Sequence, residues 1–164
     1  MWPSKCCYRG MTREEQIQHL QDLIAVAKDG ELGYATAAHH VNDTRLAEMF
    51  SMYAKERAKF VKDLQDETVR LGGEKPNDGG TSTGAMFRGW MSLKSALTGG
   101  GPEAIVAACE TGEDSAAAAF ERVVNTDVSG QTRSLIEAEW GKIKEAHQRL
   151  LHLKAEMAGE PVTK

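Results

Sequence analysis

The stretch Thr12–Val41, with the sequence TREEQIQHLQDLIAVAKDGELGYATAAHHV, carries one continuous apolar repeat. Its apolar residues recur at alternating steps of three and four, which is the spacing of one face of an α-helix. They are Ile17, Leu20, Ile24, Ala27, Tyr34, Ala38 and Val41, and only the charged Glu31 interrupts them. Thr12 and Glu15 have the spacing of a capping box at a helix N-terminus. The stretch therefore predicts a long helix from Thr12 to about Val41.

A second long helix follows after a short turn. Asn42-Asp43 supplies the turn and an N-cap, and the apolar spacing continues to Leu71, where Gly72-Gly73 ends it. The two helices are therefore expected to be antiparallel neighbours. Residues Gly72–Ser82 are rich in Gly, Asn, Asp, Ser and Pro and predict a loop, which leads into a shorter helix over Thr83–Leu97.

Two more long helices complete the pattern. Gly99–Gly101 ends the short helix, and Pro102 suits the first turn of a third long helix that reaches about Thr126. The turn Asp127–Gly130 leads into a fourth that reaches about Met157. No segment alternates with the period of a β-strand. We predict an all-α fold, a ferritin-like up-down four-helix bundle with a long crossover that carries a short extra helix between the second and third long helices.

Composition and charge exclude several classes of protein. The 164 residues are 41% hydrophobic and 27% charged, which is typical of one globular domain, placed here at residues 12–158 with tails at 1–11 and 159–164. No apolar run approaches the ~20 residues of a membrane span. A net charge of −4 argues against binding to nucleic acid or to an anionic membrane surface. The three cysteines form no CxxC pair, which favours the reducing cytoplasm.

Each long helix carries an ionisable residue near the middle of its apolar face. In chain order these residues are Glu31, either Glu56 or Arg57, Glu113 and His147. A carboxylate in an apolar core costs several kcal/mol unless it is paired, hydrogen-bonded or bound to a cation. Four such residues at comparable height predict a polar centre, in which Glu31 and Glu113 are buried beside a cation.

These residue types match part of a known metal-ligand pattern. Di-iron and di-manganese carboxylate proteins use a Glu from each of two helices and Glu-x-x-His from each of two others. Glu31 and Glu113 match the first two positions, while Glu56 and His147 each supply half of a Glu-x-x-His motif. These four residues are the predicted metal ligands, with iron or manganese as the expected metal.

Two lysines depart from that pattern. Lys59 stands where the pattern has histidine, and Lys144 stands where it has glutamate. An ammonium group cannot ligate a metal while it keeps its proton, although it can neutralise a carboxylate. Three interpretations stay open: a buried salt-bridge network, a reduced or mononuclear metal site, and charges at the edge of the apolar face.

From about Thr12 to Leu153 the chain resembles a bacterial family of ferritin-like four-helix proteins, known only as a domain of unknown function. The segments that carry the resemblance are Lys28–Tyr34, Arg57–Phe60, Leu71–Gly73, Arg88–Gly100 and Gly112–Asp114. The stretch Arg88–Gly100 is the most specific, because it is not a generic helical pattern. The resemblance implies the fold, a bacterial origin and an uncharacterised role.

The sequence favours a non-catalytic or weakly metal-binding module with an interaction or stress-related role, acting as a homodimer in the cytoplasm. One alternative is a di-metal or mononuclear carboxylate oxidoreductase or a metal-storage protein that uses iron or manganese. Another is a carrier of a small apolar ligand, with a cavity under the crossover helix lined by Phe87 and Trp90.

Overall fold

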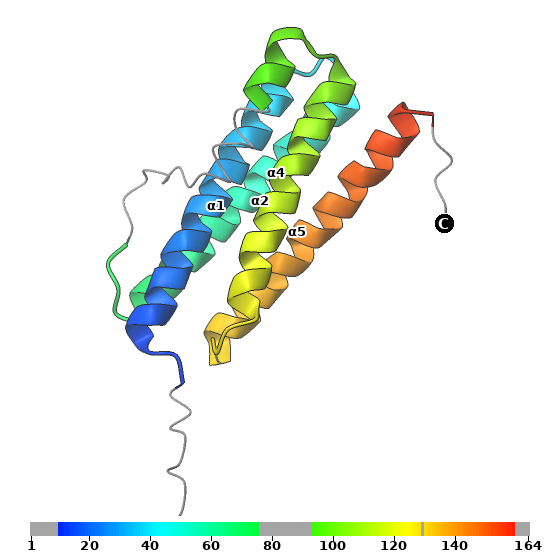
Figure 1. The fold of residues 1–164 in the computed structure, drawn as a ribbon. Helices are drawn as coiled ribbons and strands as arrows, with labels where there is room; N and C mark the ends of the chain where they lie inside the picture. Colours follow the sequence, from blue (N-terminus) through cyan, green and yellow to red (C-terminus); the bar gives the residue numbers. More distant parts are fainter. Residues whose placement is uncertain (1–9, 76–92, 129, 160–164) are drawn as a thin grey trace, which may run out of the picture.

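Four long helices run up and down beside one another in the computed structural model, which describes residues 10–75, 93–128 and 130–159 (Figure 1). They are α1 (Arg13–His40), α2 (Thr44–Arg70), α4 (Pro102–Val124) and α5 (Gly130–Met157). The described ranges contain no β-strand. The predicted all-α bundle is confirmed, and the helix ends lie within two residues of those expected from the sequence.

The local signals that predicted the helix ends are present in the structure. At the start of α1 the Thr12 hydroxyl accepts a hydrogen bond from the Glu15 amide at 3.2 Å, and the Glu15 carboxylate accepts one from the Thr12 amide at 2.7 Å. Asp43 caps α2 by accepting from the amide of Leu46 at 3.0 Å. Gly72, just after α2, has a φ of 87°, which a residue with a Cβ rarely adopts.

The crossover between α2 and α4 is described only in part. Residues 93–99 are helical, so the short helix ends two residues later than the predicted Leu97. The rest of the predicted helix, with Phe87 and Trp90, lies outside the described residues. The first nine and last five residues of the chain lie outside them as well.

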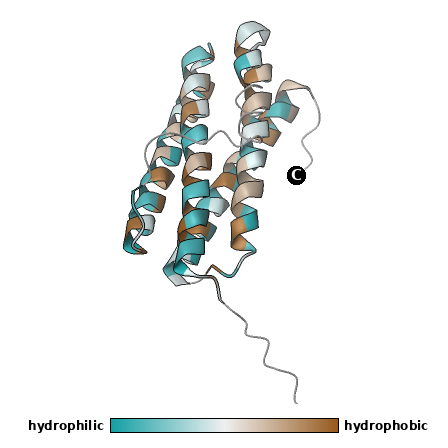
Figure 2. Cartoon of the chain, turned by 60° about the vertical axis from the view of Figure 1, so that its left-hand side comes forward, coloured by the Kyte–Doolittle hydropathy of each residue, from teal (hydrophilic) through white to brown (hydrophobic). Residues whose placement is uncertain are grey.

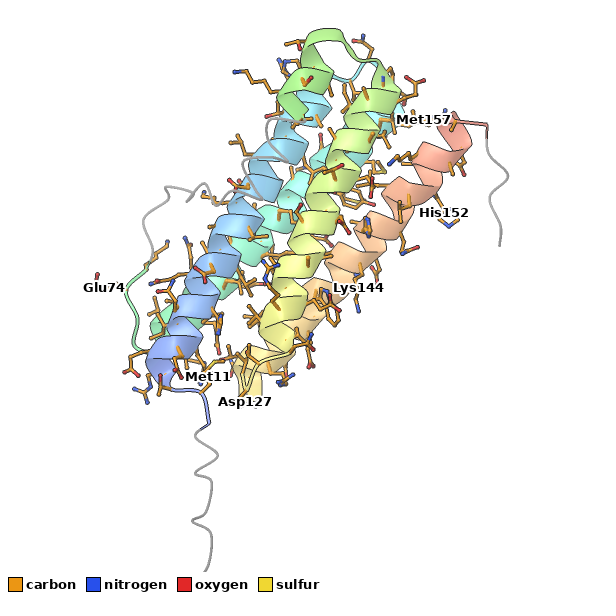
Figure 3. All side chains as sticks on the ribbon, in the orientation of Figure 1. Met11, Glu74, Asp127, Lys144, His152 and Met157 are labelled. Atoms are coloured by element: carbon orange, nitrogen blue, oxygen red, sulfur yellow. The ribbon has the colours of Figure 1, made fainter. Side chains whose placement is uncertain are left out.

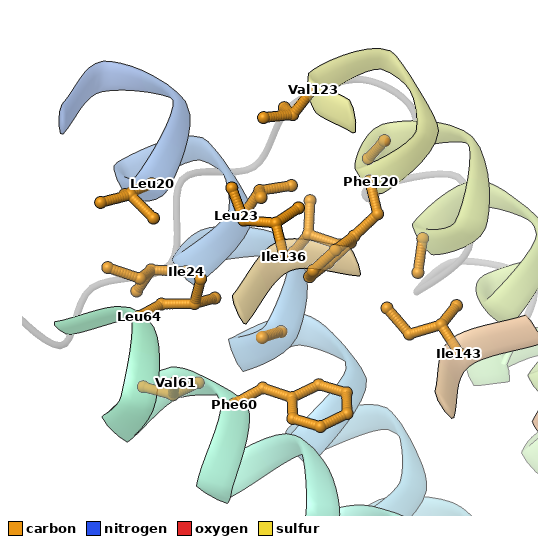
Figure 4. Packing of buried hydrophobic residues seen from close by; sticks show 14 of the residues in the cluster. Leu20, Leu23, Ile24, Phe60, Val61, Leu64, Phe120, Val123, Ile136 and Ile143 are labelled. Atoms are coloured by element: carbon orange, nitrogen blue, oxygen red, sulfur yellow. The ribbon is translucent and has the colours of Figure 1, made fainter. Parts of the chain in front are cut away.

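The core divides into two apolar clusters along the bundle axis. The first contains Leu20, Leu64, Phe120 and Ile136 among others, packed from all four long helices (Figure 4). The second gathers at the opposite end around Phe50, and Leu93 from the crossover packs into it. Hydrophobic and hydrophilic residues alternate along each helix, as a single buried face requires (Figure 2). The middle turns of the long helices lie between these two clusters.

A polar contact joins α2 and α5 near one end of the bundle. The buried carboxylate of Glu67 accepts hydrogen bonds from Thr132 and Gln131 of α5 and from Arg70 of its own helix. The hydrogen bond from Arg70 is the main cause that lowers the pKa of Glu67, with Thr132 and Gln131 adding to it. Among the described helices, none is both long and apolar enough to cross a membrane.

Candidate functional site

Arg57 and Glu113 form an ion pair in the layer between the two apolar clusters. Arg57 projects inward from α2 and Glu113 from α4, and Nη2 of Arg57 lies 2.8 Å from Oε1 of Glu113. Their side chains are only 1% and 3% exposed. The other terminal nitrogen of Arg57 donates to Oε2 of Glu56 at 2.9 Å, and Glu56 reaches toward the surface with 29% of its side chain exposed. One guanidinium therefore contacts two of the predicted site carboxylates.

Aromatic rings enclose the guanidinium. Its central carbon lies 4.9 Å from the ring centroid of Phe60 and 5.9 Å from that of Tyr34, distances at which a cation is attracted to a ring face. The ring of Tyr34 in turn stacks on Phe50 and contacts Tyr53. The guanidinium therefore contacts two aromatic rings as well as two carboxylates.

Burial and pairing act together on the pKa values of this group. Burial raises the pKa of Glu113, and the charge of Arg57 opposes that rise. Burial acts to lower the pKa of Arg57, but the charge of Glu113 and its other acidic neighbours raise it overall. The pKa of Tyr34 lies well above its usual value, first because it is buried and second because Glu113 is close. Arg57 therefore stays charged and Tyr34 stays protonated at neutral pH.

Three buried polar atoms of this group make no hydrogen bond to any described residue. They are the hydroxyl of Tyr34, Nε of Arg57 and Oε2 of Glu113. The Tyr34 hydroxyl interacts with the Glu113 carboxylate, although their contact does not meet the geometry of a hydrogen bond. Buried polar atoms in proteins are almost always hydrogen-bonded, so these three mark a place with unused bonding capacity.

A cavity of about 60 Å³ lies beside the ion pair, between α1 and α4. Gly30 and Gly33 of α1 and Gly112 of α4 line it, and Leu93 from the crossover contributes a wall. The missing side chains of these glycines leave space between the two helices. One alternative from the sequence included an apolar cavity under the crossover helix, lined by Phe87 and Trp90. The observed cavity adjoins the crossover at Leu93 but is partly lined by charged groups, and Phe87 and Trp90 lie outside the described residues.

Cys109 also lines the cavity but is not an activated thiol. It is buried, as expected for a small apolar core residue, and its pKa is raised to about 12 by burial and by the charge of Glu113. The thiolate is the reactive form of cysteine, so Cys109 is a poor nucleophile near neutral pH.

Glu31 is not buried, contrary to the prediction. Its side chain is 35% exposed, and its carboxylate lies 3.9 Å from the ammonium group of Lys28. The inward-facing residues of α1 at this level are Ala27, Gly30 and Tyr34, which also recur at steps of three and four. Because glycine has no side chain, the sequence pattern placed Glu31 in the position that Gly30 occupies.

His147 lies at the edge of the interior instead of its centre. Its Nε2 is 3.1 Å from Oε1 of Glu110, and the ammonium group of Lys154 is 3.0 Å from the other oxygen of that carboxylate. The side chain of His147 is 18% exposed, while its neighbour Ala146 is the buried residue of this turn. This group joins α4 to α5, and none of its hydrogen bonds reaches Arg57 or Glu113.

The two lysines considered as buried counter-ions both point outward. Lys59 is 70% exposed and pairs with Asp63 on its own helix. Lys144 lies on the exposed side of α5 with its ammonium group 3.5 Å from the ring centroid of Trp140 (Figure 3). The cation buried beside Glu113 is Arg57, which the sequence analysis gave as the alternative to Glu56 on the inward face but not as the counter-ion.

A second buried carboxylate, Glu139 on α5, was missed. It is 3% exposed, and neither of its oxygens has a hydrogen-bond partner among the described residues. Burial, with a contribution from the charge of Asp63, raises its pKa to about 9. The buried residues of α5 are Thr132, Ile136, Glu139, Ile143, Ala146 and Leu150, spaced alternately by four and three. That spacing was the available signal, but the sequence analysis placed Trp140 and His147 on the inward face, each one residue after a buried position.

The four predicted metal ligands do not converge in the structure. Glu56 and Glu113 share Arg57, whereas Glu31 and His147 have other partners. Within the described parts of the chain, no group of three or more His, Cys, Asp or Glu side chains could hold a metal ion. A metal-binding role for these four residues stays a prediction.

Comparison with known proteins establishes the fold and the family. The structure is similar to the crystal structure of a two-domain protein from Anabaena variabilis that contains DJ-1/ThiJ/PfpI-like and ferritin-like domains, with a TM-score of 0.72 and 10% sequence identity. The match covers 99% of this chain and 48% of that protein, so the chain spans about half of its length. The predicted ferritin-like fold is confirmed.

No curated protein matches this sequence. Residues 15–126 match the family model described as Domain of unknown function (DUF2383). This range contains both Arg57 and Glu113. The chain therefore belongs to the DUF2383 family, as the sequence resemblance predicted.

Proposed function

We propose that this protein is a non-catalytic ferritin-like module, with an interaction or stress-related role, whose interior contains a buried ion pair instead of a metal centre. The observation that supports this proposal is the contact of 2.8 Å between Arg57 and Glu113, both almost fully buried. Ferritin-like di-metal proteins direct carboxylates at metal ions from facing helices. Here a permanent organic cation meets the inward carboxylate of α4.

Arg57 makes this position unfavourable for a metal ion. A guanidinium does not lose its proton in proteins, so its charge stays beside Glu113. A divalent cation at the same carboxylate would be repelled by that charge, and the repulsion is strong in a poorly solvated interior. Metal binding would require Arg57 to leave a position enclosed by Phe60 and Tyr34.

The groups beside the ion pair also favour a non-catalytic role. General acids and bases act best with a pKa near the working pH. The pKa of Cys109 is raised to about 12, and that of Tyr34 is raised well above its usual value. Both groups therefore keep their protons at neutral pH and offer neither a base nor a nucleophile.

Metal analysis tests this proposal against the iron or manganese alternative. The protein is produced with excess iron or manganese, freed of loosely bound ions, and its metal content per chain is measured. We expect well under one ion per chain, because Arg57 already neutralises Glu113. One or more ions per chain in the unaltered protein, lost in Glu113→Gln, would overturn the proposal and favour a metal centre.

The proposed interaction role includes self-association into a homodimer in the cytoplasm. Light scattering coupled to size exclusion, run over a range of protein concentrations, measures the mass in solution. A mass of two chains is expected at micromolar concentration. A mass of one chain throughout would remove the dimer from this proposal and leave the ion-pair argument untouched.

A further inference from the structure

We infer that the cavity between α1 and α4 binds one small primary alkylammonium ion, with the ammonium group at Asp29 and the short apolar tail inside the cavity. The walls are mostly apolar and include Val26, Leu93 and Phe120. Asp29 from α1 and Ser115 from α4 add polar groups, and both residues are only partly buried. The cavity is partly open as well, so a molecule from solution can enter it.

Asp29 gives the lining of the cavity an uncompensated charge. The charged residues among the described lining are Asp29, Arg57 and Glu113, and the last two form the ion pair. No described hydrogen bond or ion pair involves the side chain of Asp29, and the neighbouring Lys28 lies 3.9 Å from Glu31. Burial raises the pKa of Asp29, and no cation among the described residues opposes that rise. The lining therefore carries one net negative charge, which attracts a cation and repels an anion.

Two partly buried side chains can accept hydrogen bonds from the ammonium group. One is the carboxylate of Asp29. The other is the hydroxyl of Ser115, which donates to the carbonyl oxygen of Thr111 at 3.1 Å and can still accept through its own oxygen. An ammonium group has three N–H donors and no acceptor, so it suits a site that offers acceptors. The unpaired polar atoms of the ion pair take no part, because they are fully enclosed.

Glycines leave the space for the apolar tail. Gly33 follows Asp29 by four residues and Gly112 precedes Ser115 by three, so each glycine shares a helix face with one polar group. A Cβ added at Gly33 would lie 3.9 Å from Cδ2 of Leu93, and one added at Gly112 would meet nothing within 4 Å. The cavity of about 60 Å³ has room for a tail of about three carbon atoms, since a water-sized group needs at least roughly 10–15 Å³.

n-Propylammonium is the probe, and propan-1-ol is the matched neutral control with the same tail. The backbone amide signals of Gly33 and Gly112 are followed by NMR while either probe is added at neutral pH and constant ionic strength. We expect saturable shifts with n-propylammonium in the millimolar range, as is reasonable for so few atoms. Propan-1-ol is expected to bind about tenfold more weakly, because it brings no positive charge to Asp29.

Variants test the two parts of the site separately. Asp29→Asn removes the charge with little change of shape, so it should abolish the preference for n-propylammonium and leave the binding of propan-1-ol unchanged. The double variant with Gly33→Ala and Gly112→Ala reduces the space and should weaken the binding of both probes. Asp22→Asn is the control, because it removes the same charge from an exposed position on α1, and it should change neither affinity.

Four outcomes would overturn the inference. They are no saturable shift with n-propylammonium, equal binding of the two probes, unchanged binding in the double glycine variant, and equal effects of Asp29→Asn and Asp22→Asn. Equal binding of the probes would identify an apolar cavity in which Asp29 has no role. Equal effects of the two asparagine variants would identify a general attraction of the cation to the negatively charged protein.

Discussion

The guanidinium of Arg57 contacts two carboxylates and two aromatic rings from a position with almost no exposure to solvent. Desolvating two charges costs several kcal/mol per ion, and mutual attraction offsets that cost only when the geometry is good. The distance of 2.8 Å to Glu113 meets that condition. The pair therefore contributes little net stability, but either charge alone in the interior would be strongly unfavourable.

Glu139 is also a buried carboxyl group, but unlike Glu113 it has no hydrogen-bond partner among the described residues. Its raised pKa, about 9, means that the folded protein keeps this proton at neutral pH. The unfolded chain releases it near the ordinary value of 4.5. Between these two values the folded state binds more protons, so the free energy of unfolding falls as pH rises.

Glu139→Gln is therefore expected to stabilise the protein more at about pH 8 than at about pH 5. Glutamine cannot ionise, so the variant lacks the loss of up to about 1.4 kcal/mol per pH unit that Glu139 imposes between its two pKa values. The free energy of unfolding of both proteins is measured by urea titration at the two pH values.

Glu137→Gln is the matched control, because Glu137 is on the same helix with 48% of its side chain exposed. Its effect on the free energy of unfolding is expected to be nearly the same at both pH values. An equal effect of Glu139→Gln at both pH values would show that Glu139 is ionised in the folded protein, and would contradict this account of its burial.

Individual site residues could be predicted from the sequence only where the apolar repeat identified the face of the helix that is buried. Glu113 was predicted to be buried beside a cation, and it is. Arg57 was considered but Glu56 was chosen as the site residue of this helix. Two adjacent charged residues give no apolar signal that shows which of them faces inward. Glu139 was missed because Trp140 gave a stronger apolar signal one residue away.

At the scale of the helices, α1 and α2 pack closely because Gly30 leaves room for the stem of Arg57. A Cβ at Gly30 would lie 3.3 Å from Cγ of Arg57 and 3.4 Å from its Cδ. These contacts are tight, and the stem cannot move freely while its guanidinium is paired with Glu113. The glycine of α1 and the ion pair of α2 and α4 are therefore parts of one packing arrangement.

Gly30→Ala is expected to destabilise the protein despite the better helix propensity of alanine. In an unobstructed helical position, Gly→Ala stabilises by about 0.5–1 kcal/mol. Gly141→Ala on α5, where an added Cβ meets nothing within 4 Å, should show that gain. Thermal unfolding of both variants compares them directly. A gain at Gly30 equal to that at Gly141 would show that Arg57 moves aside at little cost.

The helices themselves were predictable because their end signals are local. The capping box of Thr12 and Glu15 and the left-handed Gly72 act within a few residues, so no tertiary information was needed. The glycines that create the cavity gave no such signal. A glycine inside a helix identifies a space only once its neighbouring helix is known.

At the scale of the whole molecule, a polar layer separates two apolar clusters. The sequence analysis predicted Glu113 in a polar centre, and Glu113 lies in this layer, where its ion pair joins α4 to α2. It did not predict that Glu31 would lie outside the layer or that the cation would be an arginine. The ferritin-like fold thus positions inward carboxylates, while the identity of the cation depends on side chains that the fold alone does not specify.

A double-mutant cycle on Arg57 and Glu113, measured in the presence of a chelator, tests this account most directly. Arg57→Met alone should lower the free energy of unfolding by about 3–5 kcal/mol, because it leaves Glu113 buried and unpaired. Glu113→Leu alone should also lower it, but by less, because Arg57 keeps its contact with Glu56. The variant with both changes should recover most of that loss, since two apolar side chains replace the pair. Losses that simply add in the double variant would contradict the account, because the two charges would then not depend on each other.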